Sequence, residues 1–127
     1  MAKILLIDDD VDMVEMYKII LTHRGHKVTA AYNAAEARAL MKKRAPADAV
    51  VLDVMMETAT IGFDLAREIH QKYPKLPILM LSGVRGAKDL PFKFEPDEDW
   101  LPVKDVLEKP VKPEVLLKAV EKALSAQ

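Results

Sequence analysis

The sequence has no cysteine, almost no net charge and no long hydrophobic run. Without thiols, disulfide crosslinks and thiolate metal sites are excluded, which is consistent with a reducing compartment. The 19 Lys and Arg residues nearly balance the 20 Asp and Glu residues, leaving a formal charge of −1. The chain therefore lacks the strong positive field that holds nucleic acids or anionic membranes, and we expect it to bind neither.

The N-terminal apolar run is short. It covers Ile4–Ile7 and is followed at once by three aspartates, so it predicts neither a signal peptide nor a membrane span. We expect a cytoplasmic protein by default. With 127 residues, half of them hydrophobic, the chain is suited to a single compact domain spanning residues 1–127.

Short apolar runs alternate with amphipathic stretches along the chain. The runs predict buried strands over residues 4–7, 28–31, 49–52 and 78–81, with a weaker one at 106–107. Apolar residues at helical spacing predict helices over residues 14–21, 33–41, 62–73 and 113–124. This alternation predicts an α/β fold, a doubly wound five-stranded parallel sheet with helices on both faces.

Aspartates follow two of the predicted strands. Asp8, Asp9 and Asp10 come after the first strand, and Asp53 ends the third. Parallel strands bring these carboxylates to one rim of the sheet, where two charges about 4 Å apart repel by about 4 kcal/mol at an effective dielectric of about 20. A hard divalent cation, Mg²⁺ or Mn²⁺, would relieve this repulsion. A simpler role is open for Asp10 or Asp12, which can cap the following helix.

Two further polar residues are predicted at the same rim. Ser82 ends the fourth strand and Lys109 ends the fifth. Each is unremarkable alone, but together with the acids they complete a phosphoryl site. In that site Lys109 balances the charge on the phosphoryl oxygens and the Ser82 hydroxyl donates a hydrogen bond to one of them.

These motifs resemble the receiver domain of response regulators across essentially the whole chain. The matching segments are ILLIDDD at 4–10, VLDVMM at 51–56, LSG at 81–83 and LEKP at 107–110. The resemblance implies a flavodoxin-like fold and a role for each matching residue. The implied roles are phosphoacceptor for Asp53, direct Mg²⁺ ligand for Asp9, ligand through water for Asp8, ligand through its backbone carbonyl for Met55, switch hydroxyl for Ser82, phosphate contact for Lys109, and a cis peptide at Lys109-Pro110.

The resemblance also implies how such a protein works. Asp53 takes a phosphoryl group from the phosphohistidine of a sensor histidine kinase or phosphotransfer protein, and the acyl phosphate is later hydrolysed. The added charge draws Ser82 and its loop inward, which changes binding to a downstream partner that the sequence does not identify. The chain would then be no enzyme beyond its own phosphoryl transfer and dephosphorylation.

The sequence departs from the family's pattern in three places. Val106 stands where an aromatic switch residue is common, and residues 58–60 lengthen the polar loop after the third strand. Residues 83–105 contain several prolines, so we expect the fourth helix to be shortened or replaced by a Pro-rich loop. The aromatic residues of that segment, Phe92, Phe94 and Trp100, form either a lid over the sheet edge or a partner-docking surface.

Three other functions fit parts of the pattern. An Asp-nucleophile phosphatase of the haloacid dehalogenase kind needs a second Asp two residues after the nucleophile, where this chain has Met55. A flavodoxin-like FMN protein needs hydroxyls and amides in its first loop, where this chain has acids that repel phosphate. A phosphorylation-independent adaptor with the receiver fold is the principal alternative.

Overall fold

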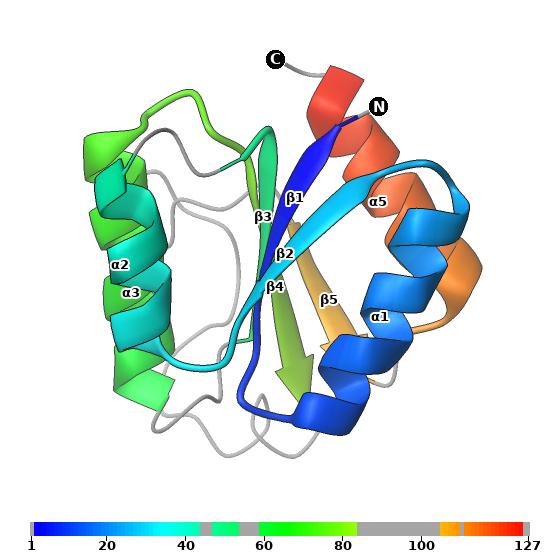
Figure 1. Cartoon of the computed structure of the whole chain (residues 1–127), viewed down its shortest axis with the longest axis horizontal. Helices are drawn as coiled ribbons and strands as arrows, with labels where there is room; N and C mark the ends of the chain where they lie inside the picture. The colour runs from blue at the N-terminus through cyan, green and yellow to red at the C-terminus, as the bar shows by residue number, and fades with distance from the viewer. Residues whose placement is uncertain (1, 44–46, 54–58, 84–104, 110, 126–127) are drawn as a thin grey trace.

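The computed structural model describes residues 2–43, 47–53, 59–83, 105–109 and 111–125 (Figure 1). Strands and helices alternate within these ranges, as the sequence predicts. The strands are β1 (Lys3–Ile7), β2 (Lys27–Ala31), β3 (Ala49–Asp53), β4 (Ile78–Gly83) and β5 (Asp105–Lys109), and the helices are α1 (Val11–His23), α2 (Ala34–Lys43), α3 (Ala59–Lys72) and α5 (Pro113–Ser125).

The described strands form one parallel sheet in the order β2-β1-β3-β4-β5. Helices α1 and α5 cover one face of this sheet, and α2 and α3 cover the other (Figure 1). The predicted doubly wound α/β architecture is therefore confirmed, and this strand order is the flavodoxin-like one. The predicted shortening of the fourth helix concerns residues outside the described ranges.

Both faces of the sheet are buried, which explains why the strands are continuously apolar. Leu5 and Ile7 of β1 pack in the core beneath α2 and α3, whereas Ile4 and Leu6 pack in the core beneath α1 and α5. Strands β3 and β4 alternate in the same way, because successive side chains of a strand point to opposite faces. Burial on two sides fixes the strand register, which in turn aligns the strand ends.

Helix α1 is capped at both ends. At its N-terminus, the Asp10 side chain accepts a hydrogen bond from the Met13 N–H. At its C-terminus, the Gly25 N–H donates to the Thr22 carbonyl at 3.0 Å and the His26 N–H donates to the Leu21 carbonyl at 3.2 Å. These two bonds form a Schellman motif, which needs a left-handed residue, and Gly25 has φ 92°.

The start of α3 differs from the sequence prediction. The sequence pattern predicts a polar loop over residues 58–60 and a helix over residues 62–73, but Ala59 and Thr60 already belong to α3. Gly62 then lies inside the helix and is buried. Packing against neighbouring elements thus outweighs the low helix propensity of glycine.

In the described part of the chain, no helix is long and apolar enough to cross a bilayer.

Replacing Gly25 by Ala tests the end of α1. A Cβ at φ 92° is unfavourable, so Gly25→Ala should lower the free energy of unfolding by about 1 to 2 kcal/mol in urea titrations. Gly25→Asn should lose less, because Asn tolerates this conformation better. Equal unfolding midpoints for wild type and Gly25→Ala would contradict the assigned motif.

Candidate functional site

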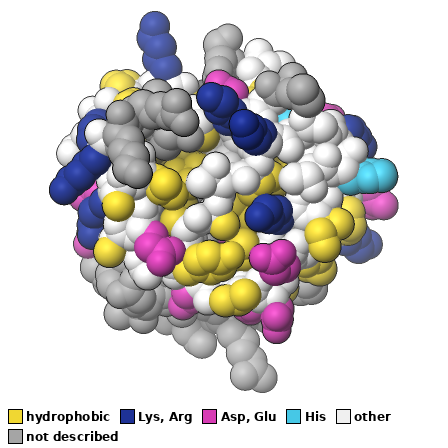
Figure 2. All heavy atoms as spheres, in the orientation of Figure 1, with side chains coloured by type: hydrophobic (Ala, Val, Ile, Leu, Met, Phe, Trp, Pro, Cys, Tyr) yellow, Lys and Arg dark blue, Asp and Glu magenta, His cyan; other side chains and the backbone are white. Residues whose placement is uncertain are grey.

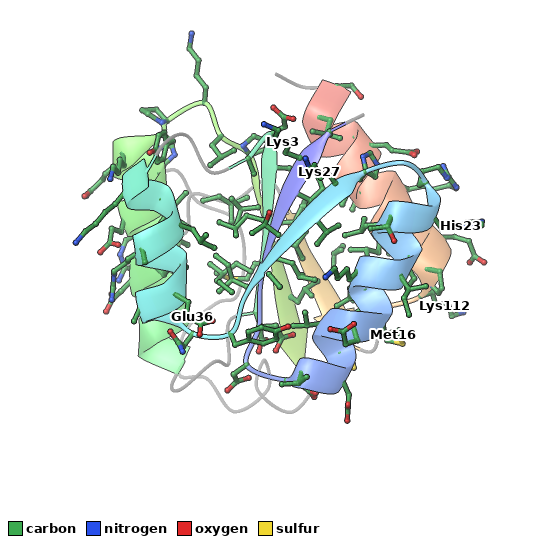
Figure 3. All side chains as sticks on the ribbon, viewed as in Figure 1. Lys3, Met16, His23, Lys27, Glu36 and Lys112 are labelled. Atoms are coloured by element: carbon green, nitrogen blue, oxygen red, sulfur yellow. The ribbon has the colours of Figure 1, made fainter. Side chains whose placement is uncertain are left out.

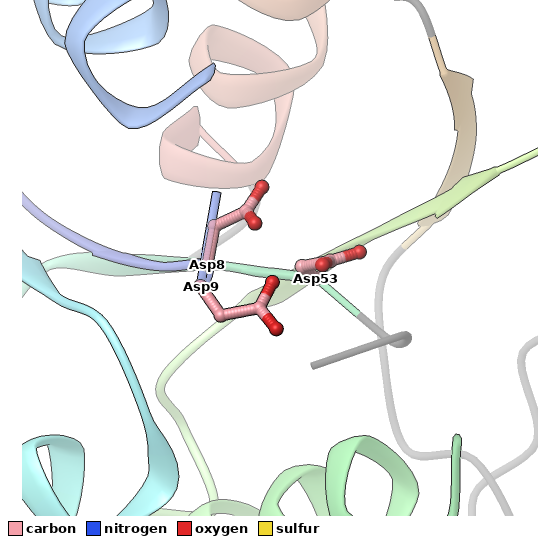
Figure 4. Close-up of side chains that lie close together, drawn as sticks. All are labelled: Asp8, Asp9 and Asp53. Carbon is pink, nitrogen blue, oxygen red and sulfur yellow. The ribbon is translucent and has the colours of Figure 1, made fainter. Parts of the chain in front are cut away.

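Three aspartates meet at the rim formed by the C-terminal ends of the strands. In the β1–β3 register Ile7 lies beside Leu52, so the next residues, Asp8 and Asp53, lie side by side. Carboxylate oxygens of Asp8, Asp9 and Asp53 lie within 4.8 Å of one another. Figure 4 shows the three side chains gathered at this end of the sheet.

The three carboxylates differ in their access to solvent. Asp8 is 0% exposed and Asp53 is 3% exposed, whereas Asp9 is exposed. Burial of ionised carboxylates is costly unless other charges or hydrogen bonds compensate for it. The site therefore joins two acids set into the sheet with a third at its surface, a combination that attracts cations and leaves one open side.

Asp8 is held by the main chain on two sides. Its N–H donates to the Ala31 carbonyl at 3.1 Å, which ties it to the end of β2. Its Oδ1 accepts a hydrogen bond from the Asp10 N–H at 3.0 Å. The expected capping role of Asp10 is confirmed by its Oδ1, which accepts the Met13 N–H at 3.2 Å. The bond from Asp10 to Asp8 was not predicted, although an Asp two residues before a helix cap is its typical sequence signal.

Strands β4 and β5 end at the same rim. Asp53 pairs with Leu81, so Ser82 is the next residue along β4, and Gly83 pairs with Lys109. The backbone thus brings Ser82 and Lys109 to the ends of adjacent strands, as the sequence predicts. Their side chains lie outside the described part of the structure, and so do Met55, Pro110 and the possible partner surface of Phe92, Phe94 and Trp100. The roles and the cis peptide inferred for these residues stay predictions.

The donor set suits a hard divalent cation. Two oxygens bound to one Mg²⁺ at about 2.1 Å lie at most about 4.2 Å apart, so three carboxylates within 4.8 Å need only small shifts or a bridging water. Mg²⁺ typically uses few carboxylates and keeps several waters. Asp9 is exposed, so the cluster is in contact with solvent on this side.

The sequence matches the response regulator receiver domain family over residues 4–121. The chain belongs to this family. Among relatives of this receiver, Protein PilH of Pseudomonas aeruginosa is 32% identical over an alignment that covers 98% of this chain and 99% of PilH. The crystal structure of the receiver domain of NtrX from Brucella abortus is 31% identical with a TM-score of 0.80, and the match covers 98% of this chain and 99% of that one.

Other relatives are longer than this receiver. The Salmonella typhimurium protein PgtA, named a phosphoglycerate transport system transcriptional regulatory protein, is 35% identical over 97% of this chain. The chain spans 28% of PgtA and 34% of the response regulator GtcR of Aneurinibacillus migulanus. The shared part is the receiver domain of two-component signalling, so what the longer relatives do through their remaining sequence does not transfer to this chain.

Removing one charge from the rim should stabilise the fold when metal is absent. In EDTA, Asp53→Asn should raise the free energy of unfolding by on the order of 1 to 3 kcal/mol, because it removes repulsion of Asp53 with Asp8 and Asp9. Asp12→Asn is the control, since Asp12 is exposed in the first turn of α1 and should give a small decrease. A loss of stability in Asp53→Asn would show that repulsion does not dominate this site.

Proposed function

We propose that this receiver accepts a phosphoryl group onto Asp53 in a reaction that requires Mg²⁺ or Mn²⁺. The observation that carries the proposal is the meeting of Asp53 with Asp8 and Asp9, which provides a nucleophile beside a cation-binding pair. Asp8 and Asp9 would hold the metal, with the Met55 carbonyl as a further predicted ligand. Bound there, the metal would neutralise charge on the transferring phosphoryl oxygens.

The chemistry follows from the placement of Asp53. One of its carboxylate oxygens forms a bond to phosphorus while the bond from phosphorus to the donor's imidazole nitrogen breaks, and the imidazole leaves in neutral form after taking up a proton. Lys109 and Ser82 are the residues predicted to contact the remaining oxygens, because the backbone places both at the neighbouring strand ends.

The signal proposed for this chain is a change of charge at the rim. Phosphorylation adds a group carrying about −1.5 to −2 charges, and this alters which partner binds or passes the group on in a phosphorelay. The chain is then a switch in the cytoplasm whose own transfer and hydrolysis are its only catalysis. A phosphorylation-independent adaptor is the second candidate, and the Asp-nucleophile phosphatase is disfavoured by Met55 at the position of its general acid.

Phosphate incorporation tests the proposal. With acetyl phosphate and Mg²⁺, mass spectrometry should detect one added phosphoryl group on the wild-type chain. Asp53→Asn should give none, and Asp9→Asn should slow incorporation at least tenfold, because removing a metal contact weakens stabilisation of the transferring charge. Asp12→Asn should behave as wild type.

Two outcomes would contradict the assignment. Incorporation that persists in Asp53→Asn would mean that another residue is the acceptor. No incorporation into the wild type, with the fold verified by circular dichroism, would favour the adaptor.

Helix α1 exposes apolar side chains on the side of the acidic rim. Helix α1 begins directly after the acids and exposes Val11 (56%), Met16 (41%) and Ile19 (67%). Met16 and Ile19 are three residues apart and share a side of the helix, and Figure 3 shows Met16 on the outer side of α1. Figure 2 shows hydrophobic side chains at the surface on this side of the molecule. We infer that a protein phosphodonor contacts this part of α1 while its phosphohistidine reaches the rim.

Charged substitutions on α1 test the docking surface. Met16→Lys and Ile19→Lys should slow phosphoryl transfer from a histidine kinase that phosphorylates the wild-type chain by roughly fivefold or more, because an apolar interface contact is worth about 1 kcal/mol or more. Their reaction with acetyl phosphate should not change. The control is Val115→Lys, the same change at an exposed apolar residue of α5. Equal rates of transfer for all three variants and wild type would exclude α1 as the docking surface.

A further inference from the structure

We infer that Asp10 is a positioning residue of the acidic site, because the cap it places on α1 also holds the carboxylate of Asp8. The inference rests on the proposed metal site at Asp8, Asp9 and Asp53. It assigns Asp10 a role beyond that of an ordinary helix cap, although Asp10 lies outside the cluster of three neighbouring carboxylates.

Asp10 makes three polar contacts that together span the turn between β1 and α1. Its N–H donates to Asp8 Oδ1 at 3.0 Å, on the side of the site. Its Oδ1 accepts the Met13 N–H at 3.2 Å and its carbonyl accepts the Val14 N–H at 3.0 Å, both on the side of the helix. Asp10 is therefore bonded to the site through its N–H and to the helix through its side chain and its carbonyl.

The cap determines where the Asp10 N–H points. Capping holds Asp10 in an extended conformation, with φ −84° and ψ 102°, in which its N–H reaches back to Asp8. The Asp8 main chain is fixed by its bond to Ala31, and the Asp10 N–H is a contact that orients the Asp8 side chain through Oδ1. Asp9 lies between the two residues and has its backbone enclosed by the same turn. Loss of the cap should thus loosen two proposed metal ligands together.

Charge-matched variants can separate positioning from electrostatics. All three variants, Asp10→Ala, Asp10→Asn and Asp10→Ser, remove the Asp10 charge. Asn and Ser can still accept the capping hydrogen bond, whereas Ala cannot. The binding of Mn²⁺ is measured directly from the loss of the free-ion signal in electron paramagnetic resonance. We expect similar Mn²⁺ affinities for Asp10→Asn and Asp10→Ser and a roughly tenfold weaker affinity for Asp10→Ala, as for the loss of other residues that orient metal ligands.

Helix α2 provides a matched control for the loss of a cap. Asn33 caps α2 as Asp10 caps α1, because its Oδ1 accepts the Glu36 N–H at 2.8 Å. Asn33→Ala should lower the free energy of unfolding about as much as Asp10→Ala, by about 1 kcal/mol, and leave the Mn²⁺ affinity unchanged. If Asn33→Ala weakened Mn²⁺ binding as much as Asp10→Ala does, general destabilisation would explain the loss of affinity. That result would overturn the inference.

The remaining outcomes distinguish the inference from the proposed function. If the wild-type chain binds Mn²⁺ and Asp9→Asn abolishes this binding, the metal site stands. Equal affinities for Asp10→Ala, Asp10→Asn and Asp10→Ser would then overturn the positioning role alone. If the wild-type chain binds no Mn²⁺, the proposed metal site and the inference both fail.

Discussion

The repulsion between buried carboxylates at one rim of the sheet is the constraint on which this molecule depends. Asp8 and Asp53 are almost fully buried side by side because the register of β1 and β3 leaves them no other place. Charges this close interact strongly at the low dielectric of a protein, so the energy of the site depends on every charge that enters or leaves it. This sensitivity gives a small domain a means of responding to a change in charge at a single residue.

The register of β1 holds these carboxylates in place despite their repulsion. Four successive residues of β1 are buried, alternately in the two cores, so slipping the strand by one residue would exchange the side chains between two differently shaped layers. At the opposite end of the sheet, Lys3 of β1 pairs with Lys27 of β2 (Figure 3), and the Lys3 N–H donates to a carboxylate oxygen of Asp48 at 2.8 Å. The cluster of Asp8, Asp9 and Asp53 therefore lies at the end of the sheet away from these two lysines.

Much of the fold and the surroundings of Asp53 could be predicted because both follow from short-range patterns. Continuous apolar runs identify strands buried on two faces, and the parallel arrangement then requires Asp8 and Asp53 to share a rim. The start of α3 could not be predicted, because Gly62 has low helix propensity and is helical only through packing that the local sequence does not show. The bond from Asp10 to Asp8 was missed for a different reason: an Asp side chain often accepts from the main chain two residues on, but at this turn only helix capping was considered.

Helix α1 joins the three parts of the proposed function. Its cap is bonded to Asp8, its first turns expose the apolar side chains proposed to meet a partner, and its last turn is fixed by Gly25 and by an ion pair of Arg24 with Glu121 of α5 at 2.8 Å. A partner that presses on the exposed side therefore contacts an element bonded directly to a proposed metal ligand. The exposed apolar residues and the Asp10 cap therefore lie on one continuous helix, and Asp9 and Asp10 lie in the turn that joins this helix to β1. This geometry gives partner binding and metal binding a short physical route by which each can alter the other.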